Sequence, residues 1–174
     1  IPLYAGGSVS ISPTMASEDI IKTLQDNQIT ILIGVPRLYA AIRKGIMDKI
    51  HASFAARTLF AMARKINKKS FSRLIFKTVH KKMGGSLQYL VSGGAALDKE
   101  VARDYQTLGF EVLEGFGMTE SAPMITFTRP GRVVIGSPGE ALPGTTIEII
   151  NGEITAMGRQ IMQGYLNRPE ETAE

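Results

Sequence analysis

Two glycine-bearing runs near the middle of the chain carry the residue types that a phosphate and metal site needs. They are residues 92–97 (SGGAAL) and residues 114–121 (EGFGMTES). Glycine lets backbone N–H groups approach a ligand closely and adopts left-handed turns at little cost. A threonine hydroxyl can donate to a phosphate oxygen, and a carboxylate can hold Mg²⁺ together with phosphate and water oxygens. The adjacent Thr119 and Glu120 therefore predict a phosphate and magnesium site.

The chain around these runs alternates between strand and helix patterns. Short apolar or alternating runs predict strands at four places: residues 7–12, 29–33, 87–91 and 110–113. Helical periodicity fills the intervals. This alternation predicts an α/β fold with a doubly wound, mostly parallel sheet and right-handed crossovers. Ligands of such sheets bind beyond the carboxyl ends of strands, and both glycine-bearing runs directly follow a predicted strand.

Local signals place several of the boundaries. Ser17 predicts a helix start, Pro36 a second, and Asp98 a third that runs through residue 108. The short run at residues 29–33 (ITILI), in which four of five residues are β-branched, predicts a strand covered on both faces. Apolar periodicity predicts two further amphipathic helices, within residues 54–66 and 71–83.

After Met124 the pattern becomes antiparallel. Short strands are predicted at four places: residues 125–127, 132–135, 146–150 and 153–157. Asn151-Gly152 is a strong two-residue hairpin signal. We therefore expect a partial α/β subdomain over residues 1–135, and the truncated start of a small antiparallel, β-barrel-like subdomain over residues 136–174.

Composition sets the broad class. The 174 residues suffice for one domain with a real core, and 44% of them are apolar. There is no cysteine, which is compatible with a reducing, cytoplasmic setting. No apolar run approaches the ~20 residues of a membrane span. His51 and His80 have no companions at metal-ligand spacing, so we expect surface or packing roles for both.

The charge distribution is uneven. Residues 49–97, hereafter the basic segment, contain ten of the 20 basic residues and no acidic one. The segment can be a solvated face, a surface for peripheral association with an anionic membrane, or an attractor of phosphates. Nucleic acid is not expected as a partner, because few aromatic residues lie among the charges. The sequence does not indicate an oligomeric state.

Three blocks of the chain resemble the adenylate-forming acyl-CoA synthetases, in particular the long-chain fatty acid CoA ligases. The first two blocks are residues 92–97 and 115–120, and the third comprises Gly152-Glu153-Ile154, Gly164-Tyr165 and Pro169-Glu170-Glu171-Thr172. Residues 35–39 (VPRLY) also look like the long-chain branch. The resemblance covers nearly the whole chain, in the family's order.

The resemblance implies a role for individual residues. The backbone of Gly94, Ala95 and Ala96 would lie against adenine. Residues 114–117 would all bind the nucleotide: Phe116 would stack on adenine where the family usually has tyrosine, Glu114 would accept from the adenine amino group, and the backbone of Gly115 and Gly117 would approach the ligand closely. Thr119 would contact the α-phosphate and Glu120 would hold Mg²⁺. Glu153, Gly158, Gly164 and Tyr165 would be architectural.

The implied function is ATP-dependent activation of a carboxylic acid, most naturally a long-chain fatty acid, followed by transfer to CoA. The family's lysine-bearing phosphate loop, ribose-binding aspartate and catalytic lysine are not in this sequence, so we expect an excised piece that is inactive alone. Two other readings stay open: a non-catalytic nucleotide-binding module, and a membrane-surface adaptor led by the basic segment.

Overall fold

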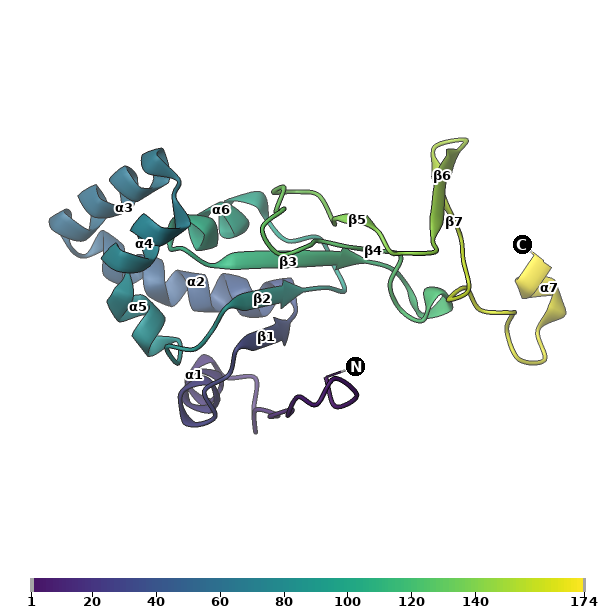
Figure 1. Ribbon diagram of the computed structural model, residues 1–174, viewed down its shortest axis with the longest axis horizontal. Helices are drawn as coiled ribbons and strands as arrows, with labels where there is room; N and C mark the ends of the chain where they lie inside the picture. The colour runs from purple at the N-terminus through teal and green to yellow at the C-terminus, as the bar shows by residue number, and fades with distance from the viewer. Residues whose placement is uncertain (1, 174) are drawn as a thin grey trace. The chain divides into compact units, whose positions relative to one another are not determined.

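In the computed structural model, which describes residues 2–173, helices and a parallel strand pair come first along the chain and antiparallel strands follow (Figure 1). The predicted α/β class is confirmed. The chain divides into two units, Ile1–Val112 and Leu113–Glu174. The subdivision at residues 135 and 136 stays a prediction.

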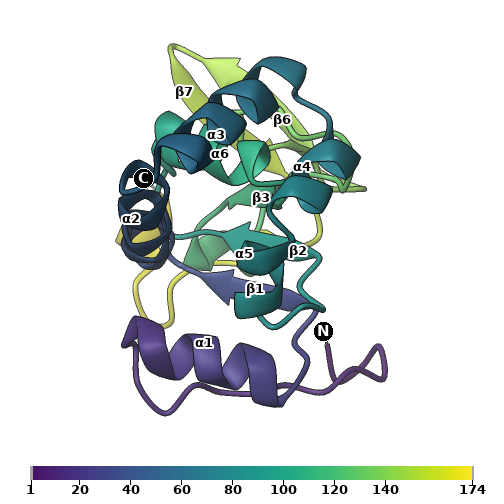
Figure 2. The same ribbon diagram turned by 90° about the vertical axis from the view of Figure 1, so that its left-hand side faces the viewer.

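Among its described residues, the first unit contains one parallel strand pair and six helices that pack against part of it. Its elements are α1 (Ser17–Asp26), β1 (Ile31–Gly34), α2 (Pro36–His51), α3 (Phe54–Ile66), α4 (Lys69–Ile75), α5 (Lys77–Lys82), β2 (Tyr89–Ser92), α6 (Lys99–Thr107) and the start of β3 (Glu111–Phe116). β1 pairs with β2 in parallel, from Ile31 opposite Tyr89 to Gly34 opposite Ser92. Figure 2 shows α2 along one side of these strands and α1 beyond β1.

Two buried tyrosines join the strands to the helices. The Tyr39 hydroxyl lies 2.9 Å from the Leu32 carbonyl oxygen and 2.7 Å from that of Val91, so it donates between β1 and β2. The Tyr105 hydroxyl donates to the Tyr39 carbonyl at 2.8 Å, and the two rings meet edge to face. Burial raises the pKa of both hydroxyls. They therefore stay protonated and act as donors, through which Tyr39 fixes α2 against the strands and Tyr105 fixes α6 against α2.

The predicted helix starts are borne out with one change of detail. Asp98 caps α6 by accepting from the backbone N–H of Glu100 at 2.9 Å and of Val101 at 3.0 Å. Pro36 occupies the first turn of α2. At α1, however, Ala16 rather than Ser17 is the capping residue, and it has no side chain that can accept a hydrogen bond.

Two expectations about strands in the first unit are wrong. Residues 7–12 form no strand, because no strand in the described part of the chain pairs with them and Val9 and Ile11 are exposed. The predicted strand at 29–33 exists as β1, but it is not covered on both faces. Ile31 and Ile33 are exposed, the latter by 69%, since nothing among the described residues packs on that side.

Residues 54–82 of the basic segment form three helices, where the sequence predicts about two. α3 matches the first predicted helix, whereas the second is divided into α4 and α5 at Phe76. The Phe76 side chain is buried and meets Phe60 edge to face, with ring centroids 6.0 Å apart. Its burial against α3 fixes the break in the helix. The three helices lie toward the amino-terminal ends of β1 and β2, away from the loop that follows β2 (Figure 1).

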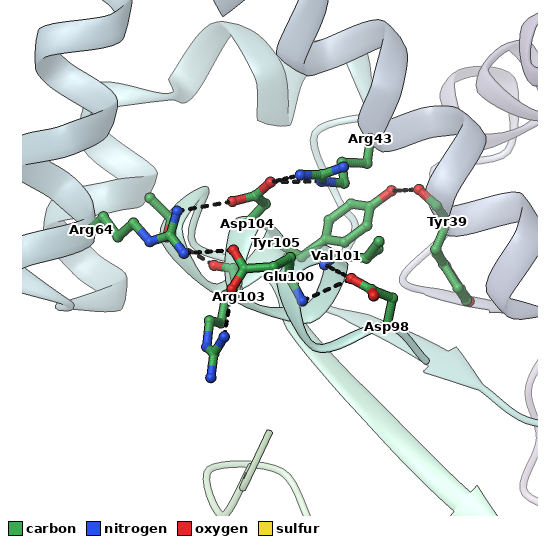
Figure 3. Close-up of polar contacts among 10 residues, drawn as sticks. Tyr39, Arg43, Arg64, Asp98, Glu100, Val101, Arg103, Asp104 and Tyr105 are labelled. Carbon is green, nitrogen blue, oxygen red and sulfur yellow. Dashed lines mark hydrogen bonds and ion pairs between the residues drawn. The ribbon is translucent and has the colours of Figure 1, made fainter. Parts of the chain in front are cut away.

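A partly buried ionic cluster connects α2, α3 and α6 (Figure 3). Asp104 on α6 is only 2% exposed, and both Arg43 Nε and Arg43 Nη2 lie 2.6 Å from its Oδ2. Arg64 of α3 reaches the other carboxylate oxygen at 3.8 Å and also binds Glu100 at 2.8 Å. Because a buried carboxylate needs a partner, this cluster ties the three helices together.

His80 is a packing residue, as expected from its isolation in the sequence. Its ring stacks on Phe110 at 4.1 Å, and Nε2 lies 2.8 Å from the Leu108 carbonyl oxygen. Burial lowers the pKa of His80, the Leu108 carbonyl opposes this, and the nearby Arg73 and Lys69 add to the lowering. The folded protein therefore holds the neutral imidazole.

This burial predicts a loss of stability in mild acid. The unfolded chain takes up a proton at His80 as the pH falls below about 6.5, whereas the folded chain resists it, so the unfolded state binds more protons. The free energy of unfolding should fall between about pH 7.5 and pH 5.5. His80→Gln keeps an N–H donor and should flatten this dependence in chemical denaturation. An unchanged slope would contradict the assignment.

The second unit is mostly antiparallel. It contains the rest of β3, a 3₁₀ turn (Thr119–Ser121), β4 (Thr126–Phe127), β5 (Glu140–Ala141), β6 (Thr146–Ile150), β7 (Glu153–Met157) and α7 (Pro169–Ala173). β4 pairs with β3 on one side and with β5 on the other, both antiparallel. The β6–β7 hairpin turns at Asn151-Gly152, where φ is +53° and +87°, as the sequence predicts. The described residues form no closed barrel.

One predicted strand of this unit is wrong. Residues 132–135 lie between two turns, in which Arg132 N–H donates to the Arg129 carbonyl and Ser137 N–H to the Val134 carbonyl, both at 3.0 Å. The Pro and Gly residues on either side favour these turns over a strand. The predicted strand at 125–127 is present as β4.

Candidate functional site

The loop after β2 presents exposed backbone between two buried anchors. Ser92, the last residue of β2, and Leu97 are both buried, while Gly94, Ala95 and Ala96 are exposed. Gly94 has φ +81°, which favours glycine, and a Cβ built there would meet nothing within 4 Å. The open space lets a flat ligand approach this backbone. The loop therefore leaves its backbone accessible, and its contact with adenine stays a prediction.

The second glycine-bearing run begins inside a strand rather than after one. Glu114, Gly115 and Phe116 belong to β3, which is longer than predicted, and Gly115 and Phe116 pair with β4. Gly117 follows in a tight place: a Cβ there would lie 2.0 Å from the Pro123 carbonyl oxygen. Only glycine fits at this position. Close packing against Pro123 therefore determines where the chain leaves the sheet.

The turn that carries Thr119 and Glu120 is fixed by one buried hydroxyl. Ser121 Oγ accepts from the Met118 N–H at 3.0 Å and donates to the Met118 carbonyl at 2.9 Å. The Thr119 side chain is exposed, and its hydroxyl has no hydrogen-bond partner among the residues that the structure describes. A rigid turn thus presents a free donor next to a carboxylate.

Glu120 has a partner that the sequence did not reveal. The Tyr165 hydroxyl donates to Glu120 Oε1 at 2.6 Å, although the two residues are 45 positions apart. This hydrogen bond lowers the pKa of Glu120, with a further contribution from its own backbone N–H, and it raises the pKa of Tyr165. Glu120 is therefore ionised at neutral pH. Tyr165 was expected to be architectural, and no local pattern links it to Glu120.

The donor set fits Mg²⁺ that arrives with a nucleotide. Among residues 2–173 no group of three or more acidic or histidine side chains could hold a metal alone. Mg²⁺ takes one or two carboxylates and fills the rest of its shell with phosphate and water oxygens. A carboxylate has about four lone-pair sites, so the Tyr165 hydrogen bond leaves room for a cation on Glu120.

Comparison with known proteins places the chain in a family. The family described as AMP-binding enzyme matches residues 1–166. Among curated relatives, a palmitoyl-CoA ligase of Gibberella moniliformis is 23% identical over 98% of this chain and 30% of its own length. Long-chain-fatty-acid–CoA ligase 1 of Schizosaccharomyces pombe is 29% identical over 83% of this chain and 25% of its own length.

Solved structures agree with this assignment. A malonyl-CoA ligase with methylmalonyl-CoA and AMP bound is 30% identical with a TM-score of 0.66, over 99% of this chain and 33% of that one. An anthranilate CoA ligase in complex with anthranoyl-AMP has a TM-score of 0.71 at 19% identity, over 98% of this chain and 30% of that one, and it supports the fold alone. The chain thus spans roughly a third or less of the proteins it resembles. By the family match over most of its length, the chain belongs to the AMP-binding enzymes.

Proposed function

We propose that the chain is part of an ATP-dependent acid–thiol ligase that activates a long-chain fatty acid as an acyl adenylate and transfers it to CoA. The observation that carries the proposal is the rigid turn at residues 119–121, which sets an exposed hydroxyl beside an ionised carboxylate in a member of the AMP-binding family. The names of the curated ligases support a long-chain acid as substrate.

The proposed reaction has two displacements. An oxygen of the fatty acid carboxylate attacks the α-phosphorus of ATP, the bond to the β-phosphate oxygen breaks, and pyrophosphate leaves. The thiol sulfur of CoA then attacks the acyl carbon, loses its proton, and displaces AMP. Both steps need reactants held in line and negative charge neutralised, which is mostly positioning and electrostatics.

The residues of this chain supply part of that positioning. The Thr119 hydroxyl donates to an α-phosphate oxygen, and Glu120 is the residue that would hold Mg²⁺. Bound Mg²⁺ would neutralise charge on the phosphates during displacement. The backbone of Gly94, Ala95 and Ala96 and the ring of Phe116 contact adenine. The Glu114 carboxylate accepts from its amino group, because a carboxylate has no proton to donate.

The alternative of a different class is a nucleotide-binding module without ligase activity. Nucleotide binding alone does not require a carboxylate beside the α-phosphate, so Glu120 favours the ligase. The complete protein should exchange labelled pyrophosphate into ATP only when a fatty acid is added. AMP or ATP binding without acid-dependent exchange would favour the binding module instead.

We further propose that the basic segment associates with the surface of an anionic, cytoplasm-facing membrane, where fatty acids partition. None of the helices within residues 2–173 is long and apolar enough to cross a bilayer. The supporting feature is the outer face of α3. Phe60 and Ala63 of this helix are buried, whereas Phe54 is 77% exposed and Leu59, Met62 and Ile66 are also exposed.

Positive charge surrounds this face, although fewer cations are available than the sequence suggested. Arg64 turns inward to Glu100 and Asp104, and Lys69 forms an ion pair with Glu111. Arg57, Lys65 and Lys68 have no ion pair among the described residues and remain exposed. Exposed apolar side chains flanked by Lys and Arg are typical of helices that lie on anionic lipid.

The test is vesicle binding. Lys65→Gln with Lys68→Gln should weaken binding to anionic vesicles roughly tenfold or more, because each basic side chain near such a surface contributes about 1 kcal/mol. Added salt should weaken wild-type binding steeply. Lys22→Gln with Lys44→Gln, on exposed positions of α1 and α2, is the matched control and should bind like the wild type. Equal cosedimentation with anionic and neutral vesicles at low salt would refute the proposal.

A further inference from the structure

Among residues 2–173, one side chain from a distant part of the chain holds the Glu120 carboxylate. The Tyr165 hydroxyl lies 2.6 Å from Glu120 Oε1, which is a short distance typical of a hydrogen bond to an ionised acceptor. Otherwise the carboxylate is on an exposed turn, where a glutamate side chain samples several rotamers. The hydrogen bond selects one orientation from among them.

The segment that carries Tyr165 is itself anchored on Glu120. The backbone N–H of Met162 donates to the Glu120 carbonyl oxygen at 2.8 Å. Main chain and side chain of the same residue are therefore bound by a stretch of only four residues, Met162 to Tyr165. This double attachment fixes the distance between Tyr165 and the turn at residues 119–121.

Thr172 holds Tyr165 from the other side. Thr172 Oγ1 accepts from the Tyr165 N–H at 2.9 Å and donates to the Arg168 carbonyl at 2.7 Å. Gly164 permits this contact, because its φ is +151° and a Cβ there would lie 2.6 Å from Thr172 Cγ2. The glycine, the tyrosine and the threonine thus form one support that holds the Tyr165 main chain in place.

We infer that Tyr165 is a positioning residue, which orients the Glu120 carboxylate toward the magnesium–nucleotide complex. The inference rests on the proposed function, because it takes Glu120 as the magnesium ligand. A carboxylate oriented in advance loses less conformational freedom when it binds a cation. Hydrogen-bond partners of metal ligands typically contribute 10–100-fold to metal affinity or activity.

The experiment measures metal affinity rather than turnover. Mn²⁺ serves as the probe, in the presence of an ATP analogue with a methylene bridge between the α- and β-phosphorus, and free Mn²⁺ is followed by electron paramagnetic resonance. In the complete protein, Tyr165→Phe should raise the Kd of Mn²⁺ roughly tenfold. It should leave the thermal unfolding midpoint nearly unchanged, since only an exposed hydroxyl is removed. Tyr89→Phe, whose hydroxyl has no hydrogen-bond partner among the described residues, is the matched control and should bind like the wild type.

Glu120→Gln separates this inference from the proposed function. If each single variant weakens Mn²⁺ binding and Tyr165→Phe adds nothing to Glu120→Gln in the double variant, both the metal role and the positioning role are supported. Loss of affinity in Glu120→Gln with none in Tyr165→Phe refutes the positioning role alone. Wild-type affinity in Glu120→Gln refutes the metal role, and the positioning role with it.

A pair of Thr172 variants checks the support behind Tyr165. Thr172→Ser keeps the oxygen that accepts from the Tyr165 N–H and should bind Mn²⁺ like the wild type. Thr172→Val keeps the shape but removes that oxygen, so it should weaken binding in the same direction as Tyr165→Phe and by a smaller factor. If the two Thr172 variants are equal, the support does not reach Glu120.

Discussion

Glu120→Gln is expected to reduce acid-dependent pyrophosphate exchange by about a hundredfold or more, with little change in folding. The amide keeps the size of the side chain but loses the negative charge that a magnesium ion requires. The Tyr165 hydroxyl can still donate to the amide oxygen, so the surrounding loop should keep its hydrogen bond. The loss should therefore report the metal role and not a collapse of the turn.

The matched control for this variant is Glu148→Gln. Glu148 is an exposed glutamate on β6, in the same unit of the chain, and no function is proposed for it. Its exchange rate should stay within about twofold of the wild type, as expected for a surface change away from any special feature. Exchange at the wild-type rate in Glu120→Gln would contradict the assignment of the magnesium ligand.

Asp104→Asn is expected to be the most damaging change to stability. Removing one partner of a buried ion pair leaves the other charge uncompensated and typically costs 3–5 kcal/mol. Arg43 is 33% exposed and can recover some hydration, so we expect about 3 kcal/mol, at the lower end of that range. Chemical denaturation of the variant beside the wild type measures this loss.

Glu100→Gln is the control for the buried site. Glu100 pairs with Arg64 and Arg103 in the same cluster, but its side chain is 51% exposed, so water replaces the lost contacts. Its effect on the denaturation midpoint should be much smaller than that of Asp104→Asn. Equal effects would mean that burial of Asp104 does not determine the strength of the cluster.

Local signals in the sequence predicted most of the elements that local forces determine. Asp98 caps α6 because its carboxylate reaches two backbone N–H groups within three residues, and Asn151-Gly152 adopts the positive φ values that a tight hairpin needs. The wrong predictions concern strands, which form only where a partner strand lies beside them. Residues 7–12 have a strand-like pattern but no strand beside them, and residues 132–135 lie between turns.

In the same way, some features of the candidate site could be predicted from the sequence and others could not. Thr119 and Glu120 could be selected from residue type alone. The glycine at position 117 is also explained, because the structure leaves no room for a Cβ there. The Tyr165 contact could not be predicted, because 45 residues separate it from Glu120 and no periodic pattern joins them. Asp104 was also missed, since a charged residue among inward-facing positions of α6 gives no sign of the arginines that pair with it from other helices.

The central claim is that the fatty acid carboxylate attacks the α-phosphorus of ATP. The most direct measurement is oxygen transfer with a fatty acid labelled by ¹⁸O in its carboxyl group, ATP and CoA, followed by mass spectrometry of the nucleotide and phosphate products. If an acyl adenylate forms and CoA then cleaves its acyl–oxygen bond, the AMP product should carry one ¹⁸O atom from the acid. Unlabelled AMP, or label found in inorganic phosphate, would contradict the proposed mechanism.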